Sequence, residues 1–142
     1  MSFLYPKNLR FECNRCAICC GNTKEKTRHI IMIESEAQEI QKQTEINIET
    51  FCSEIPNKQP YKFEMKLSVD DSKCFFLKPN GCSIYNFRPL ICRFYPFELK
   101  FDETQQTYTF TATTECPTLN QGKRLTQTDF KLLFWLAEKK LL

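Results

Sequence analysis

The chain has 142 residues, among them nine cysteines, one histidine and three glycines, and its formal net charge is +3. Three isolated glycines exclude the glycine-rich loops that bind nucleotide phosphates, and a single histidine excludes zinc sites that need two. The small positive charge counts every cysteine as neutral, whereas a metal-bound cysteine is a thiolate, so net charge gives no support for nucleic-acid binding. The length suits one domain, and we expect residues 1–142 to form a single one.

The N-terminal sequence MSFLYPKNLRFE lacks the features of a secretory signal, and no apolar run reaches membrane-spanning length. We therefore expect a cytoplasmic protein that makes no membrane contact, in a compartment where thiols stay reduced. Nine cysteines in that compartment indicate metal binding more than disulfides, and the odd count points the same way.

The first half of the chain is predicted to hold two short helices among short strands. Ser35 and Gln38 form a capping box that opens the first helix, and Pro56 ends the second. The clearest strand alternates apolar and polar side chains at period two. The predicted elements are a strand over 9–12, a loop over 13–20 closed by a turn at 21–22, a strand over 28–33, a helix from 35 to about 44, a helix over 48–55 and a strand over 61–68.

The second half is predicted to hold two hairpins, a helical turn and a terminal helix. The turn sequence Lys78 to Gly81 joins segments 74–77 and 82–85 and brings Cys74 close to Cys82. Pro89 opens a short helical turn that contains Cys92 and ends before residue 96. The remaining elements are a hairpin of 97–101 with 108–113 and a helix capped by Thr126 and Asp129, with apolar positions Phe130, Leu133, Phe134, Ala137 and Leu141.

These elements predict the α+β class, a small single domain of short antiparallel hairpins and two or three helices. The apolar fraction is modest once the cysteines are set aside, so we expect bound metal to stabilise the fold.

Cysteines carry the strongest chemical signal. Cys13, Cys16 and Cys19 recur at every third residue, so one turn of chain can direct three sulfur atoms to one metal centre. Cys20 directly follows Cys19, and we expect its side chain to diverge toward a second centre. Eight cysteines are predicted metal ligands: Cys13, Cys16, Cys19, Cys20, Cys74, Cys82, Cys92 and Cys116.

Two further residues are left outside the predicted site. Cys52 shares an apolar helix face with Ile48 and Ile55, which favours a buried free thiol. His29 lies in an apolar strand pattern, which favours a core or surface histidine over a ligand.

The spacing bears on the identity of the metal. Structural zinc usually takes paired CxxC knuckles, and only the first cluster is of that kind. A CxxCxxC triplet with a remote cysteine followed by proline, as in Cys116-Pro117, is typical of a ferredoxin-type 4Fe-4S cluster. The spacing favours iron–sulfur, with zinc as the alternative. Arg15, Arg88 and Arg93 lie in or beside the cysteine motifs, where they either offset negative charge or lie solvated at the surface.

Several strings resemble the YkgJ-type cysteine-cluster family in order and spacing, from about Cys13 to Cys116. They are CxxCxxCC at 13–20, CFFL at 74–77, CSIY at 82–85 and RPLICRFYPF at 88–97. The resemblance implies a domain that chelates zinc or iron. A similar cluster occurs in the larger flagellin lysine N-methylases, where it is implicated in holding an iron–sulfur cofactor. This chain has no recognisable S-adenosylmethionine loop, so the resemblance carries methyl transfer over only weakly.

We therefore expect a metal-binding protein with thiolate-ligated centres of redox or structural role, and with a protein partner or substrate in place of nucleic acid. The alternatives are a cluster-dependent, methyltransferase-like enzyme and a zinc-stapled interaction module. Whether the protein is an enzyme stays open at this stage. The run LLFWLA at 132–137 is either a partner surface or part of a core helix.

Overall fold

The computed structural model describes residues 2–13, 18–24, 26–113 and 115–141. Its α-helices are α1 (Glu34–Thr44), α2 (Ile48–Phe51), α3 (Leu90–Phe94) and α4 (Gln127–Lys140), and its 3-10 helices are η1 (Ile18–Cys20) and η2 (Tyr85–Phe87). Its strands are β1 (Phe3–Leu4), β2 (Ile31–Met32), β3 (Cys52–Glu54), β4 (Phe63–Met65), β5 (Leu77–Lys78), β6 (Gly81–Cys82), β7 (Phe97–Asp102) and β8 (Thr107–Ala112). Short strands, paired mostly antiparallel, and four helices confirm the α+β class.

The chain forms two compact units. The middle unit comprises residues 15–93, and the terminal unit comprises residues 1–14 with 94–142. Within the described parts of the chain, no helix is both long enough and apolar enough to cross a membrane.

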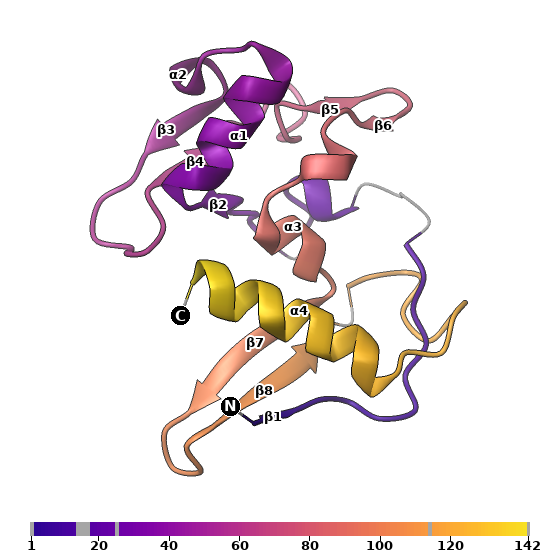
Figure 1. The fold of residues 1–142 in the computed structure, drawn as a ribbon. Helices are drawn as coiled ribbons and strands as arrows, with labels where there is room; N and C mark the ends of the chain where they lie inside the picture. The colour runs from indigo at the N-terminus through magenta and orange to yellow at the C-terminus, as the bar shows by residue number, and fades with distance from the viewer. Residues whose placement is uncertain (1, 14–17, 25, 114, 142) are drawn as a thin grey trace. The chain divides into compact units, whose positions relative to one another are not determined.

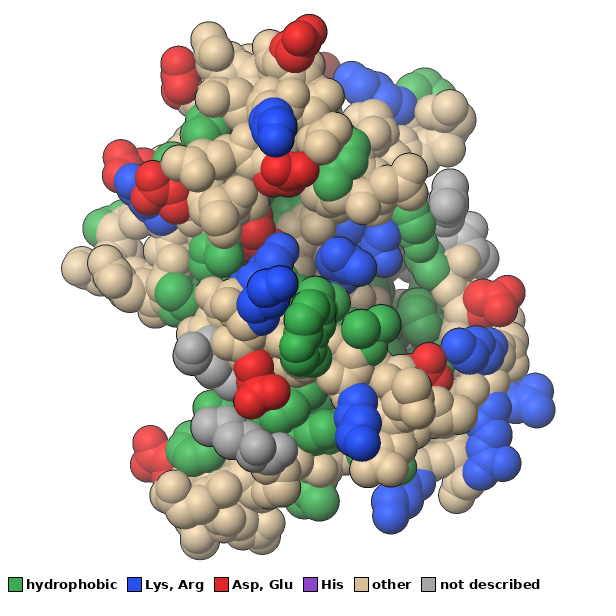
Figure 2. All heavy atoms as spheres, viewed as in Figure 1, with side chains coloured by type: hydrophobic (Ala, Val, Ile, Leu, Met, Phe, Trp, Pro, Cys, Tyr) green, Lys and Arg blue, Asp and Glu red, His purple; other side chains and the backbone are tan. Residues whose placement is uncertain are grey.

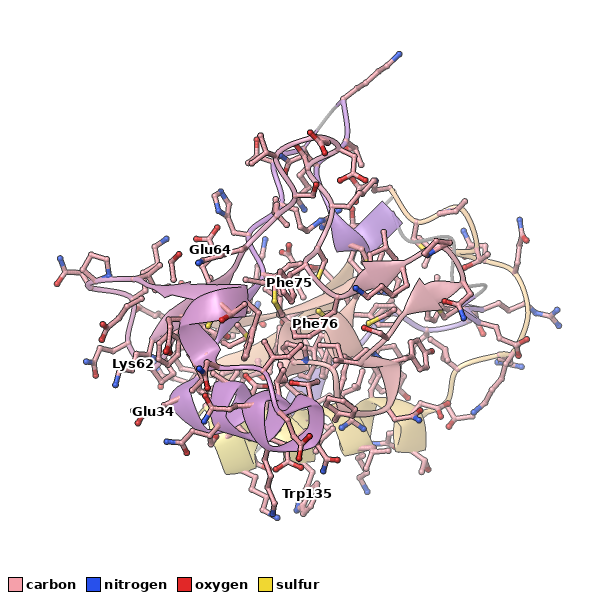
Figure 3. The ribbon with its side chains drawn as sticks, turned by 90° about the horizontal axis from the view of Figure 1, so that it is seen from above. Glu34, Lys62, Glu64, Phe75, Phe76 and Trp135 are labelled. Atoms are coloured by element: carbon pink, nitrogen blue, oxygen red, sulfur yellow. The ribbon has the colours of Figure 1, made fainter. Side chains whose placement is uncertain are left out.

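The middle unit packs α1 against a three-stranded antiparallel sheet of order β2-β4-β3 (Figure 1). Its core includes Met32 from β2, Ile40 from α1 and Phe51 from α2, none of which is exposed to solvent. At the edge of this unit Lys62 and Glu34, both labelled in Figure 3, form an ion pair of 3.1 Å.

The predicted helix over 48–55 is wrong in its second half. α2 ends at Phe51, and the next three residues form β3, in which Cys52 pairs with Met65 and Glu54 pairs with Phe63. Pairing with β4 satisfies the backbone of these residues and still buries Cys52, so tertiary contacts outweigh the local helical spacing. The predicted strand over 61–68 is also shorter, because the ladders with β2 and β3 together cover only residues 63–65.

Helix α1 ends at Thr44 as predicted, but its start differs. The helix begins at Glu34, and the carboxylate that accepts the N–H of Ile33 belongs to Glu36, at 3.2 Å. The predicted capping box of Ser35 and Gln38 is therefore wrong, because the residues that cap the helix are Ile33 and Glu36, two positions earlier. The reason is that the β2 segment delivers Ile33 into the core and fixes where the helix can begin.

The hairpin and helical turn of the middle unit follow the prediction. β5 and β6 pair antiparallel around the Pro79-Asn80 turn, with Leu77 opposite Cys82. Gly81 has a φ of +119°, a conformation that favours glycine. α3 runs from Leu90 to Phe94, within the predicted limits.

The terminal unit packs α4 along a sheet of order β1-β8-β7, in which β1 runs parallel to β8 (Figure 1). The ring of Phe130 lies 5.1 Å from that of Phe97 and 5.2 Å from that of Phe110, so α4 closes an aromatic core. The predicted hairpin is confirmed. The predicted strand over 9–12 is wrong: only Arg10 forms an isolated bridge, with Arg124, and β1 supplies the edge strand instead.

Helix α4 starts as predicted, since the carboxylate of Asp129 accepts the backbone N–H of Thr126 at 2.8 Å. Residues 132–137 (LLFWLA) contribute side chains to both the buried and the exposed face of the helix. Phe134 and Ala137 are buried in the core, whereas the side chains of Leu132 and Trp135 are 59% and 52% exposed. Apolar atoms are accordingly visible over α4 in Figure 2.

Candidate metal centre

Four cysteines of the middle unit lie close enough for their charges to act on one another. Burial is the main cause that raises the pKa of Cys92, and Cys74, Cys19 and Cys82 each raise it further. Burial likewise raises the pKa of Cys74, with additional contributions from Cys82 and Cys19. These four residues, which we call the thiol quartet, come from η1, from the segment before β5, from β6 and from α3.

Backbone pairing brings the segment that contains Cys19 beside the segment that contains Cys74. The N–H of Cys74 donates to the carbonyl of Cys20, and Gly21 forms an antiparallel bridge with Lys73. A side chain at Gly21 would collide with the carbonyl oxygen of Ser72, so only glycine permits this approach. The predicted turn at 21–22 is thus wrong, because this segment is extended and paired with residues 72–74.

Tertiary packing brings Cys82 and Cys92, the other two members of the quartet, close to Cys74. The hairpin is held by Ser83, whose N–H and Oγ both donate to the carbonyl of Phe76, at 2.9 and 2.8 Å. The rings of Phe75 and Phe76, labelled in Figure 3, lie 5.0 Å apart and nearly perpendicular. Cys82 and Cys92 pack against this hydrophobic core, which limits the access of water to their sulfur atoms.

Burial keeps these thiols neutral. Desolvation is the main cause that raises the pKa of Cys74 to about 11, and it also raises the pKa of Cys92 well above its usual value. The charge of Arg88 opposes the shift at Cys92, and that of Arg28 opposes the upward shift of the pKa at Cys19. A metal that binds here must therefore displace protons, and its affinity rises with pH.

The structure differs from the sequence expectation at Cys19 and Cys20. The neighbouring Cys20 thiol is the largest cause of the raised pKa of Cys19, so the two side chains interact. Cys19 also acts on Cys74 and Cys92. Cys19 therefore lies near the downstream cysteines. Cys20 does so too, as the sequence predicted, because its carbonyl accepts the N–H of Cys74 and it borders the same core.

Two further predicted ligands belong to the terminal unit. Cys13 is exposed there and Cys116 is buried, and the Cys116 sulfur lies 3.5 Å from the hydroxyl of Thr118. Cys16 and Arg15 lie outside the described residues.

The two residues left outside the site stay outside it. Cys52 is 2% exposed and donates from Sγ to the carbonyl of Ile48 at 3.3 Å. Burial raises its pKa to about 11, while Lys66 lowers it, Glu49 raises it and no described cysteine contributes. His29 is a surface residue, 64% exposed, and its Nδ1 lies 2.9 Å from a carboxylate oxygen of Glu64.

Arginines divide into those that approach the quartet and those that do not. Arg88 is half-buried, and its guanidinium donates to the backbone carbonyl of Tyr85 at 2.7 Å. The same guanidinium lies over the Tyr85 ring, 4.0 Å from the ring centroid. Arg93 is exposed. Sequence reasoning missed Arg28, because it lies eight residues beyond Cys20 and outside every cysteine motif.

The donor chemistry fits zinc or iron, since four thiols in one region supply soft ligands. Within the described parts of the chain, however, no three His, Cys, Asp or Glu side chains are arranged so that they could hold a metal ion. The quartet is therefore a set of neighbouring thiols, and ligation requires that its side chains turn toward a common point.

A family model with the description "Putative zinc- or iron-chelating domain" matches residues 12–117. Searches of curated proteins and of solved structures found no match. The matched segment contains the complete thiol quartet and all eight predicted ligands. The chain therefore belongs to the CxxCxxCC family of zinc- or iron-chelating domains.

Proposed function

We propose that this protein holds an iron–sulfur centre of redox or structural role, ligated by the thiol quartet of the middle unit. The observation that carries the proposal is the approach of Cys19, Cys74, Cys82 and Cys92, which lie far apart in the sequence. These thiols are neutral without metal, and once they lose their protons to become ligands, a bound cation compensates for the buried negative charge of four thiolates.

Two features support a centre with negative charge. Arg28 and Arg88 each act on one member of the quartet, so two guanidinium groups offset part of the charge of four thiolates. The apolar packing around Cys74, Cys82 and Cys92 lowers the local polarity, which is one of the means by which proteins tune a cluster potential.

Spacing supports iron–sulfur over zinc. Structural zinc sites are usually built from two closely spaced pairs of ligands. The quartet contains no CxxC pair, and its members are separated by 54, 7 and 9 residues. Four cysteines from separate elements can supply the four thiolates that hold the iron atoms of an iron–sulfur cluster.

The test is the metal content and colour of protein purified without oxygen. We expect iron with acid-labile sulfide, and a visible band that bleaches on addition of dithionite. Cys92→Ser should remove most of this band, whereas the matched control Cys52→Ser should keep it. Colourless wild-type protein with stoichiometric zinc would replace the iron–sulfur proposal with a zinc centre.

A further inference from the structure

Glu36 is a buried acid at the start of α1, only 6% exposed. A buried carboxylate is costly unless hydrogen bonds compensate for the lost water. One oxygen, Oε1, accepts the N–H of Ile33 at 3.2 Å, which is the local bond expected of an acid in the first helical turn. This local bond involves only one of the two carboxylate oxygens.

The other oxygen makes a long-range contact. Oε2 accepts the backbone N–H of Leu90 at 2.5 Å, across 54 positions of sequence. Leu90 is the first residue of α3, where backbone N–H groups have no acceptor within the helix. The preceding residue is Pro89, which has no N–H, so Leu90 supplies the first donor of this helix.

Helix α3 also carries a member of the thiol quartet. Cys92 lies two residues after Leu90, and its N–H donates to the carbonyl of Pro89 at 2.9 Å, so a single turn joins the two residues. Leu90 itself is 3% exposed, which leaves the turn little freedom to shift. A displacement at Leu90 would therefore move the Cys92 sulfur relative to Cys19, Cys74 and Cys82.

We propose that Glu36 is a positioning residue of the cysteine centre: its carboxylate fixes α3 through the Leu90 amide and thereby places Cys92 among the other three thiols. This inference rests on the proposed thiolate centre. Groups that orient metal ligands commonly contribute ten- to hundredfold to metal affinity.

Glu36→Asp distinguishes the bond to the Ile33 N–H from the bond to the Leu90 N–H, because it should keep only the first. An aspartate at the equivalent position of α4, Asp129, accepts the N–H of its cap residue at 2.8 Å, so the shorter acid can keep the local bond. Shortened by one methylene, it cannot at the same time reach Leu90. Glu36→Gln is the second variant, because it keeps the length but replaces one acceptor oxygen with an amide group that cannot accept an N–H.

Two controls on the same helix complete the set. Glu39→Gln changes an exposed acid whose carboxylate accepts only the side-chain amide of Gln43, at 2.9 Å. Ile40→Val removes one buried methylene and lowers stability without touching the Leu90 contact.

The experiment titrates Co²⁺ into reduced, oxygen-free protein and follows the thiolate-to-cobalt absorption band in competition with a chelator. We expect Glu36→Asp and Glu36→Gln to keep their far-UV circular dichroism, to bind Co²⁺ at least about tenfold more weakly than wild type, and to shift the band. Both controls should match wild type in band position and affinity.

The inference is overturned if Glu36→Asp binds Co²⁺ like Ile40→Val, or if neither Glu36 variant folds while Ile40→Val does. In the second case the carboxylate would serve the folding of the whole unit. If wild-type protein itself gives no thiolate-to-cobalt band, the proposed function falls together with the inference. A normal wild-type band with unchanged Glu36 variants removes the inference alone.

Discussion

Cys92 and Cys52 show how the same side chain takes different roles within one unit. Both pack in or against the core of the middle unit, and burial raises the pKa of both thiols. Three other cysteines act on Cys92, whereas Cys52 donates to a backbone carbonyl and lies among Lys66 and Glu49. What distinguishes a candidate ligand from a core thiol is therefore its neighbours.

Cys52→Ser should keep the full metal content of wild type. The substitution replaces a buried thiol with a hydroxyl that can still donate to the carbonyl of Ile48, so we expect a loss of about 1 kcal/mol in unfolding free energy. Elemental analysis and urea unfolding check both expectations. A loss of metal comparable with that of Cys92→Ser would show that Cys52 is a ligand.

Cys19→Ser and Cys20→Ser should differ, although the two residues are adjacent. Cys19 acts on Cys74 and Cys92, so Cys19→Ser should deplete the quartet centre. Cys20 is not among the residues that raise the pKa of Cys74 or Cys92, so Cys20→Ser should keep most of the metal. The measurement is metal content and visible absorption of protein prepared without oxygen, and equal depletion in both variants would contradict this division.

At the scale of elements, acidic residues in the first turns of α1 and α4 set where the helices begin. Glu36 and Asp129 occupy the same position in their helices, and each accepts the N–H of the residue before the helix. The start of α4 could be predicted from the sequence because Thr126 is a typical cap residue. The start of α1 could not, because Ile33 is not a typical cap residue.

The charge of Asp129 should stabilise the terminal helix. The N–H of Thr126 is the main cause of its lowered pKa, with smaller contributions from Lys123 and the Thr126 hydroxyl. A carboxylate with a lowered pKa stabilises the folded state above its usual pKa of about 3.9, and loses that contribution as the pH falls through the lowered value.

Asp129→Asn should therefore lower the unfolding free energy by about 0.5 to 1 kcal/mol at pH 7, and the deficit should shrink as the pH falls through the lowered pKa of Asp129. Glu138→Gln, an exposed change near the other end of α4, is the matched control and should have little effect. Urea unfolding at a series of pH values from about 7 down through the acidic range gives the comparison. A deficit that does not shrink as the pH falls would show that the effect comes from side-chain geometry and not from charge.

On the scale of the whole molecule, the two units have different sources of stability. The terminal unit has an aromatic core in which Phe110 of β8 and Phe130 of α4 meet between the sheet and the helix. The hydrophobic core of the middle unit includes Cys74 and borders Cys20, Cys82 and Cys92. We therefore expect any dependence of stability on metal to lie in the middle unit.

Removal of metal by a chelator under reducing conditions should loosen the middle unit and spare the terminal one. Structural metal can contribute on the order of 10 kcal/mol, more than most small folds can lose. Hydrogen exchange should rise in α1 and β4 while β7, β8 and α4 keep their protection. An unchanged exchange pattern throughout the chain would show that the fold does not depend on metal.

The sequence by itself determined the elements whose signals are local. The Pro79-Asn80 turn specified the β5-β6 hairpin, the proline before Leu90 specified α3, and Thr126 with Asp129 specified the start of α4. Cysteine order and spacing likewise sufficed to indicate the family, because these features are written along the chain.

Which cysteines are neighbours depends on tertiary contacts. Spacing grouped Cys19 with Cys13 and assigned Cys20 to the downstream cysteines, whereas the pairing of residues 20–22 with 72–74 brings both Cys19 and Cys20 near Cys74. The same holds for Glu36 and Leu90, whose contact spans 54 positions and leaves no local pattern. The physical reason is that capping and turn formation depend on a few adjacent residues, while the grouping of thiols depends on how distant segments pair and bury their side chains.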